Sequence, residues 1–196
     1  DLGYDDVLDD YVLTENISGV TYLDVDDKGI SDLTGIEGFT AVTDLRIRYN
    51  QLTSLDVSNN TALLTIRSNE NQLTNINVSN NAALTGLSCA YNNLSELDMS
   101  NNPLLDFLEC RSNQLTTLDM RNGVTDALTA FDARNNSLSC ILVNEEDVGW
   151  ATENWTSQNE NIDEGVIFDP ECLDLGNTYV PDDNFEQALI DLGYDD

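Results

Sequence analysis

The sequence predicts a solenoid of mostly β structure, in which short coils of chain stack along one axis. Two observations predict it: an asparagine recurs at a nearly constant spacing, and apolar residues hold fixed places before and after each asparagine. A coil of about 21 residues leaves little room for a helix after a strand and two turns. The recurring asparagines are Asn50, Asn71, Asn92, Asn113 and Asn136, at spacings of 21, 21, 21 and 23 residues.

Each part of the repeat has its own structural expectation. Apolar residues alternate with polar ones ahead of each asparagine, as at Leu84, Leu87 and Cys89, which indicates a short strand with one face inward. Stacked coils would join these strands into a parallel sheet. The asparagine stands at a turn, where its amide can satisfy backbone groups inside the coil. We expect an extended or 3₁₀ return side, with residues 55–60 and their equivalents making the second corner.

The frame L-x-x-L-x-(L/C)-x-x-N-x-L resembles the leucine-rich repeat, in the 21-residue form of internalin-like secreted bacterial proteins. The resemblance covers about residues 17–143, or about six copies, counting a degenerate first copy with Lys28 at the asparagine position. It implies an α/β solenoid that is mostly β, with a helical N-terminal cap and an irregular C-terminal cap. The expected units are the second half of a helical cap at 1–16, the repeats at 17–143, a cap at 144–176 and the first half of another helical cap at 177–196.

The four cysteines fall into two pairs. Cys140 and Cys172 bracket a segment that resembles the disulfide-closed C-terminal cap of those proteins, which implies a bridge between them; two free thiols are the alternative. Cys89 and Cys110 hold the same inward position in successive coils, where we expect buried free thiols. A bridge between these neighbouring strands is the other interpretation.

The same six residues, Asp-Leu-Gly-Tyr-Asp-Asp, stand at 1–6 and at 191–196. The apolar spacing of the flanking segments predicts two helices of one cap. We therefore interpret the sequence as a window on a tandem array, or as a subunit whose tail completes the cap of the next one. A chance match is the alternative. The residues expected to carry this assembly are Val7, Leu8, Tyr11, Phe185, Leu189 and Leu192.

Composition excludes several functions. The chain has 7 basic and 37 acidic residues, a net charge of −30 and no histidine. An acidic surface argues against nucleic-acid binding, which needs clustered basic residues. Catalysis or metal binding through histidine is impossible. No apolar run approaches the roughly 20 residues that cross a bilayer, so we expect no membrane insertion. We expect neither an enzyme nor a cofactor.

Acidic clusters raise the question of calcium. Residues 24–29 resemble the start of a calcium loop, but Lys28 and Gly35 stand where that loop needs an acidic or amide residue and a glutamate. We therefore expect a solvated strand and turn here, and no metal site. Weak calcium binding between modules, at the acidic clusters Asp5, Asp6, Asp9, Asp10 and Asp182, Asp183, is a remaining alternative to solvated helix faces.

Five of the seven basic residues fall on the exposed face of the predicted sheet. Between them lies a floor of small residues at Gly86, Ser88 and Ala90. We interpret this face as a groove for an anionic partner. Alternatively, acidic residues such as Asp44 and Glu70, with Glu109 and Asp132, neutralise the arginines in a surface ladder. The residues expected to bind are Arg46, Arg48, Arg67, Tyr91, Phe107, Arg111 and Arg134.

These observations together predict a structural or interaction module of an extracellular or cell-surface bacterial protein. Its copies would assemble head to tail through their caps, as a filament or an adhesive surface array. The alternative is a recognition module whose arginine-bearing face binds a protein or an acidic glycan.

Overall fold

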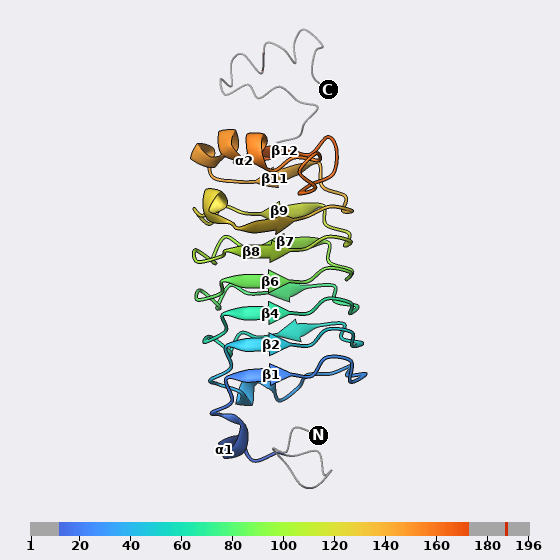
Figure 1. Cartoon of the computed structure of the whole chain (residues 1–196), viewed down its shortest axis with the longest axis vertical. Coiled ribbons are helices and arrows are strands. Elements are labelled where there is room, and N and C mark those ends of the chain that lie inside the picture. The colour runs from blue at the N-terminus through green and yellow to red at the C-terminus, as the bar shows by residue number, and fades with distance from the viewer. Residues whose placement is uncertain (1–11, 173–186, 188–196) are drawn as a thin grey trace.

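The computed structural model describes residues 12–172 and residue 187. Residues 12–172 form one elongated stack of coils (Figure 1). One side of the stack is a parallel six-stranded sheet whose order follows the chain. Its strands are β1 (Tyr22–Asp24), β2 (Asp44–Arg46), β4 (Thr65–Arg67), β6 (Gly86–Ser88), β8 (Phe107–Glu109) and β10 (Ala130–Asp132).

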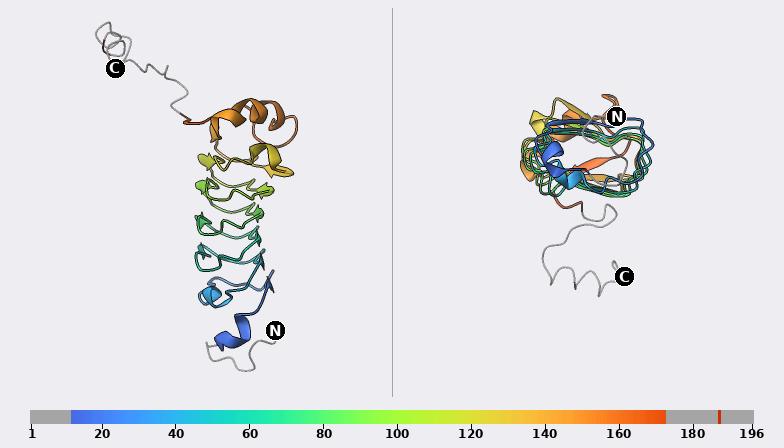
Figure 2. Two further views of the ribbon diagram at one scale, coloured as in Figure 1. Left: turned by 90° about the vertical axis from the view of Figure 1, so that its left-hand side faces the viewer. Right: turned by 90° about the horizontal axis from the view of Figure 1, so that it is seen from below.

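The return side is extended or 3₁₀, as predicted. A two-stranded sheet of β3 (Leu55–Asp56) and β5 (Ile76–Asn77) is followed by a four-stranded one. That sheet contains β7 (Glu96–Asp98), β9 (Thr117–Asp119), β11 (Cys140–Leu142) and β12 (Ile167–Asp169). The 3₁₀ turns are η1 (Ile36–Gly38), η2 (Thr125–Ala127) and η3 (Glu145–Asp147). The predicted fold class, a leucine-rich-repeat solenoid rich in β structure, is therefore confirmed, and Figure 2 shows its closed outline along the axis.

The core is a column of side chains between the two sides. The middle residue of each strand in the six-stranded sheet points inward, so that Leu45, Ile66, Leu87 and Leu108 lie in register and are fully buried. Burial of such side chains contributes roughly 1.5–3 kcal/mol each. Each coil thus covers the apolar surface of its neighbour.

The asparagines of the repeat bind the coils to one another. Asn71 Nδ2 donates to the carbonyl of Ile47 in the preceding coil at 2.9 Å and to the carbonyl of Ser68 in its own coil at 3.0 Å. Its Oδ1 accepts from the Leu52 N–H at 3.0 Å. The residue before each asparagine turns with a left-handed φ of 55° to 56° at Tyr49, Tyr91 and Asn135. One amide thereby satisfies three backbone groups at a corner that water does not reach.

A second row of asparagines, Asn60, Asn81 and Asn102, was expected to form part of an ordinary turn. The structure buries all three completely. Asn81 Nδ2 donates to the carbonyls of Val57 and Asn60, at 3.3 and 2.9 Å, both in the preceding coil. The second corner therefore also carries hydrogen bonds between coils, because its carbonyls point along the stack, where only the next coil can donate to them.

The C-terminal cap covers the last coil with η3, α2 (Val148–Asn154) and β12. Trp155 stacks on Phe131 of β10 with ring centroids 4.1 Å apart and lies 5.8 Å from Phe168. The implied disulfide between Cys140 and Cys172 is confirmed, and it closes this cap. Cys89 and Cys110 are free and buried, so the interpretation as core thiols is confirmed and the bridge between them is wrong.

At the other end, α1 (Thr14–Ile17) precedes the first strand and buries Ile17. The expected unit boundaries stay predictions. Of the expected cap-to-cap assembly residues, all six (Val7, Leu8, Tyr11, Phe185, Leu189 and Leu192) lie outside the described residues. Within residues 12–172, no helix has the length and apolar character that crossing a bilayer requires.

Replacing Asn92 by alanine tests the contribution of one corner amide. The change leaves the N–H of Leu73 unpaired inside the protein, and it removes one of the two amide donors to each of the carbonyls of Ser68 and Cys89. We expect the free energy of unfolding, measured by urea titration, to fall by about 2–4 kcal/mol. The neighbouring Asn93 is exposed, and Asn93→Ala should change it by no more than about 0.5 kcal/mol. Equal losses for the two variants would contradict the role assigned to the corner.

Candidate functional site

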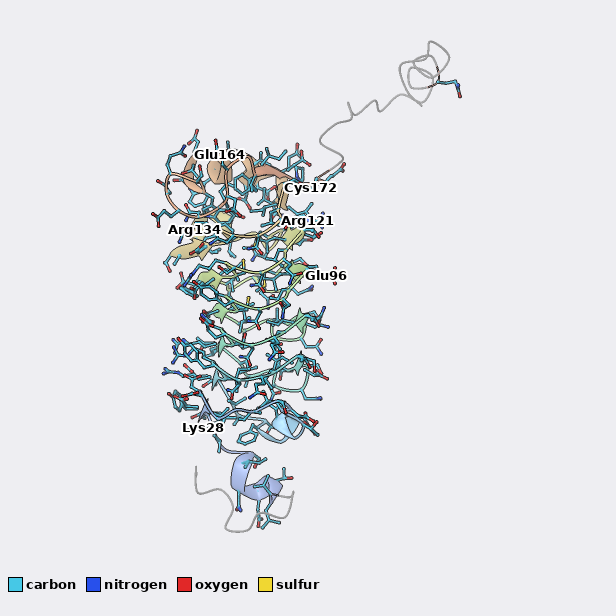
Figure 3. The ribbon with its side chains drawn as sticks, turned by 90° about the vertical axis from the view of Figure 1, so that its right-hand side faces the viewer. Lys28, Glu96, Arg121, Arg134, Glu164 and Cys172 are labelled. Atoms are coloured by element: carbon cyan, nitrogen blue, oxygen red, sulfur yellow. A yellow bond between two sulfur atoms is a disulfide. The ribbon has the colours of Figure 1, made fainter. Side chains whose placement is uncertain are left out.

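The exposed face of the six-stranded sheet is the candidate site, and its side chains come from the outward positions of each strand and from the residues that follow. Arg46 and Arg67 are registered neighbours on β2 and β4. The other face is separate from it: Figure 3 shows Lys28 and Arg134 on one side of the stack and Glu96 and Arg121 on the other. The structure therefore brings together all five arginines predicted for the sheet face.

Most of these arginines are paired with acids. Arg46 Nε lies 3.2 Å from Asp44 Oδ1, and Arg134 NH2 lies 2.9 Å from Asp132 Oδ2. Arg134 also reaches Glu160 of the cap at 2.8 Å. The surface ladder of ion pairs that the sequence left as an alternative therefore exists, but one of its four predicted acids takes no part in it. Glu70 makes no ion pair within residues 12–172.

Asp26 is the acid that sequence reasoning missed. Its Oδ2 accepts from Arg48 Nε at 2.8 Å and from Arg48 NH2 at 2.5 Å, a two-pronged contact across coils. The hydrogen bonds that Arg48 donates to this carboxylate raise the pKa of Arg48 above its usual value. The neighbouring Asp24 accepts from the Asp26 N–H at 3.1 Å, which lowers the pKa of Asp24. The segment once compared with a calcium loop thus supplies a partner to an arginine.

Glu109 accepts hydrogen bonds from three different residues of the face. Its Oε2 accepts from Ser88 Oγ at 2.5 Å and from Asn69 Nδ2 at 3.1 Å, and its Oε1 accepts from Arg111 Nε at 2.9 Å. Burial by itself would raise the pKa of Glu109, but these three hydrogen bonds outweigh burial and hold that pKa below its usual value. Its charge is therefore not free to attract a further cation.

Aromatic side chains lie among the arginines. Arg111 is centred 4.7 Å above the Tyr91 ring and donates to its hydroxyl at 2.5 Å, and Arg46 lies 4.9 Å from the Tyr22 ring. Tyr49 and Phe107 belong to the same face and are 54% and 38% exposed. Tyr91 and Phe107 were predicted as binding residues. Tyr22 was missed, although its position just before Leu23 in the degenerate first copy matches that of Asp44 before Leu45.

Arg67 differs from its neighbours. Its guanidinium makes no hydrogen bond, ion pair or ring contact with any residue of the described part of the chain. It lines a hollow of about 460 Å³ over β4, β6 and β8, together with Gly86 and Phe107. Two of the three residues of the predicted floor, Gly86 and Ser88, line this hollow, whereas Ala90 is fully buried and does not.

The return face has the opposite character. A hollow of about 470 Å³ there is lined by Glu96, Asp98 and Asp119. Arg121 is held 2.6 Å from Asp119. No group of three or more candidate metal ligands occurs among residues 12–172 and 187. This face offers neither the free cation nor the exposed aromatic rings of the sheet face.

No family model matches the chain. Internalin J of Listeria monocytogenes serotype 4b (strain F2365) is 42% identical over 52 residues, which are 26% of this chain and 6% of that protein. The chain thus spans a small fraction of this curated relative.

Solved leucine-rich-repeat structures share the fold. An internalin (inlF) of Listeria monocytogenes aligns with a TM-score of 0.57 and 21% identity, covering 81% of this chain and 52% of that one. A chain of the LRIM1/APL1C complex aligns with a TM-score of 0.57 and 23% identity, covering 67% of this chain and 26% of that one. The predicted resemblance to internalin-like leucine-rich-repeat proteins is confirmed at the level of repeat, fold and disulfide.

Replacing Glu109 by glutamine tests the electrostatics of the sheet face. Because the folded pKa of Glu109 is lowered, its carboxylate stabilises the fold above its usual pKa of about 4.5, and this contribution is lost as the pH falls through the folded value. We expect Glu109→Gln to lower the free energy of unfolding at pH 7, with the difference from wild type shrinking as the pH drops below about 4. Urea titrations at several pH values measure it. For Glu96→Gln on the return face, a pH-dependent difference of the same size would contradict the assignment.

Proposed function

We propose that this chain is a protein-interaction module that binds a partner protein through the exposed face of its six-stranded sheet. The observation that carries the proposal is the gathering of arginines and exposed aromatic rings on this one face. Arginine and tyrosine are enriched at the energetically dominant positions of protein interfaces. The likeness to leucine-rich-repeat proteins, one of them solved as a complex, supports interaction over catalysis.

The face is also organised before any partner arrives. Arg48 is held by Asp26, and Arg111 is held by Glu109 and Tyr91, so these long side chains have already lost much of their rotamer freedom. Ordering such a side chain on binding costs roughly 0.5–1.5 kcal/mol. A surface ordered within the free protein avoids part of that cost. The rigid stack beneath it keeps the outward residues in register.

We infer a secreted or cell-surface location, which would suit this role. The Cys140–Cys172 disulfide fits an oxidising compartment. The local similarity to Internalin J points the same way. The strongly acidic surface would keep such a protein soluble and would oppose nonspecific association.

Selection from a phage-displayed random peptide library on the full chain tests the sheet face. We expect selected peptides to lose at least about tenfold in affinity when Tyr49 and Tyr91 are both replaced by asparagine. Asparagine tolerates the left-handed backbone of these positions, so the fold is preserved. The control variant carries Glu96→Gln and Asp98→Asn on the return face. Peptides that respond only to the control variant would overturn the proposal.

Head-to-tail assembly of copies is a second candidate function, favoured by the repeated hexapeptide at 1–6 and 191–196. Leu13, beside α1 at the N-terminal end of the stack, is 64% exposed and offers apolar surface for a neighbouring copy. The predicted cap residues Phe185 and Leu189 would complete such a contact.

Sedimentation velocity of the full chain over a wide concentration range measures this assembly. We expect particles longer than one chain, and we expect the double variant Phe185→Ser, Leu189→Ser to shorten them because it removes apolar cap surface. Leu104→Ser changes an exposed leucine on the side of the stack and should leave the assemblies unchanged. A chain that sediments as a monomer at every concentration would contradict this function.

A further inference from the structure

The hollow over Gly86 lies on the exposed face of the six-stranded sheet. Its volume of about 460 Å³ suits one or two amino-acid side chains. The two sides that matter chemically are the guanidinium of Arg67 and the exposed ring of Phe107. A cation and an apolar wall therefore face the same small space.

Gly86 creates this space, and the fold does not require a glycine there. Registered neighbours place Thr65 on one side of it and Phe107 on the other. A Cβ atom at Gly86 would lie 3.6 Å from Thr65 Cγ2 and 3.9 Å from Phe107 Cβ, which is ordinary van der Waals contact. Glycine inside a strand lowers stability and often marks the close approach of a ligand or another chain. Glycine at position 86 therefore lowers the stability of the fold, and it leaves the bottom of the hollow open.

Among residues 12–172, no acid forms an ion pair with Arg67. Its registered neighbours are Arg46 on one side and Ser88 on the other. Asp44 is bound to Arg46, and both carboxylate oxygens of Glu109 accept hydrogen bonds from other residues. A half-buried guanidinium with five N–H donors gains from a carboxylate that can accept two of them.

We propose that this hollow, named here the Gly86 pocket and made by Arg67, Gly86 and Phe107, binds an acidic side chain of a partner polypeptide. The carboxylate pairs with Arg67, and an adjacent apolar side chain packs against Phe107. The inference rests on the proposed function of the sheet face and names the chemistry that this face recognises.

The charges around the pocket favour one isolated acidic group over a polyanionic glycan. Asp106 and Glu109 line the same hollow, as does Arg48, and Asp44 and Asp132 lie on the same face. An acidic glycan with a charge on each sugar would place further anions beside these carboxylates, which is unfavourable. A peptide can present one carboxylate to Arg67 and otherwise neutral contacts to the aromatic rings.

Binding of two matched probes to the ¹⁵N-labelled full chain tests the pocket. The probes are the blocked dipeptide acetyl-Glu-Phe-amide and its glutamine analogue, followed by nuclear magnetic resonance through the Gly86 amide and the Arg67 Nε–H. We expect the acidic probe to bind about tenfold more tightly than the neutral one. Arg67→Gln should abolish that preference. Arg121→Gln, on the return face, should retain it.

The variant Gly86→Val distinguishes an effect on binding in the pocket from an effect on the stability of the fold. We expect it to weaken the acidic probe by about tenfold or more while the urea midpoint stays the same or rises, because a β-branched residue suits a strand. Ala130→Val changes the equivalent position of β10, outside the hollow, and should leave binding unchanged. A lower urea midpoint for Gly86→Val would show that the fold needs the glycine, and would overturn the argument.

Other outcomes also decide the matter. An acid preference that survives Arg67→Gln would overturn the pocket. So would Arg67-dependent binding of a sulfated oligosaccharide without any response to the acidic dipeptide, because the ligand would then be a glycan. Library peptides that require Tyr49 and Tyr91 but are insensitive to Arg67→Gln would refute the pocket alone. If they required neither, the proposed function of the face would fail as well.

Discussion

The hydrogen bonds of the corner asparagines are the constraint on which the rest of this structure depends. A 21-residue coil turns so tightly that several carbonyl and N–H groups point into its interior, where water is absent. Each amide, such as that of Asn71, satisfies groups in its own coil and in the preceding one. A buried amide at the same place in every coil sets the distance and the register between coils. The parallel sheet and the apolar column follow from that register.

The register between coils also decides which surface residues lie side by side. Because equivalent residues lie side by side along the stack, a charged residue that recurs in the repeat lies next to a residue of the same charge in the next coil. Arg46 and Arg67 are such a pair. The molecule offsets this repulsion with acids from the same strand or from an adjacent coil, and Asp26 reaches Arg48 across 22 residues of sequence. The sheet face is consequently ordered and close to neutral, although the chain carries a net charge of −30.

Recognition on such a face depends on where the pairing is incomplete. Paired arginines such as Arg48 and Arg111 are already held in place, and their charge is largely neutralised by the acids beside them. Among residues 12–172, Arg67 has no acid partner, and residue 86 is a glycine. In the proposed pocket, a ligand therefore meets both an unpaired positive charge and a hollow that can hold a side chain. The solenoid tolerates this because its stability resides in the column of inward residues and in the corner amides, not in the outward positions.

Much of the fold was predictable from the sequence, because the same pattern of apolar residues and asparagine recurs in each repeat. The period, the inward residues, the parallel sheet and the extended return side follow from alternation and spacing. The resemblance to internalin-like proteins added the Cys140–Cys172 bridge. The face carrying Arg46, Arg67 and Arg111 was also predictable, because outward positions alternate with inward ones along a strand.

Only the tertiary structure decided the finer contacts, since they join residues from different coils. The partner of Arg48 is Asp26 of the preceding coil, and spacing along the chain gives no measure of how far two side chains reach across it. The burial of Asn81 depends on the direction of carbonyls in a neighbouring coil. The sequence by itself determined the coil and its two faces. Stacking determined which charges pair, which amides are buried and which arginine remains free, because each of these outcomes depends on distances between coils.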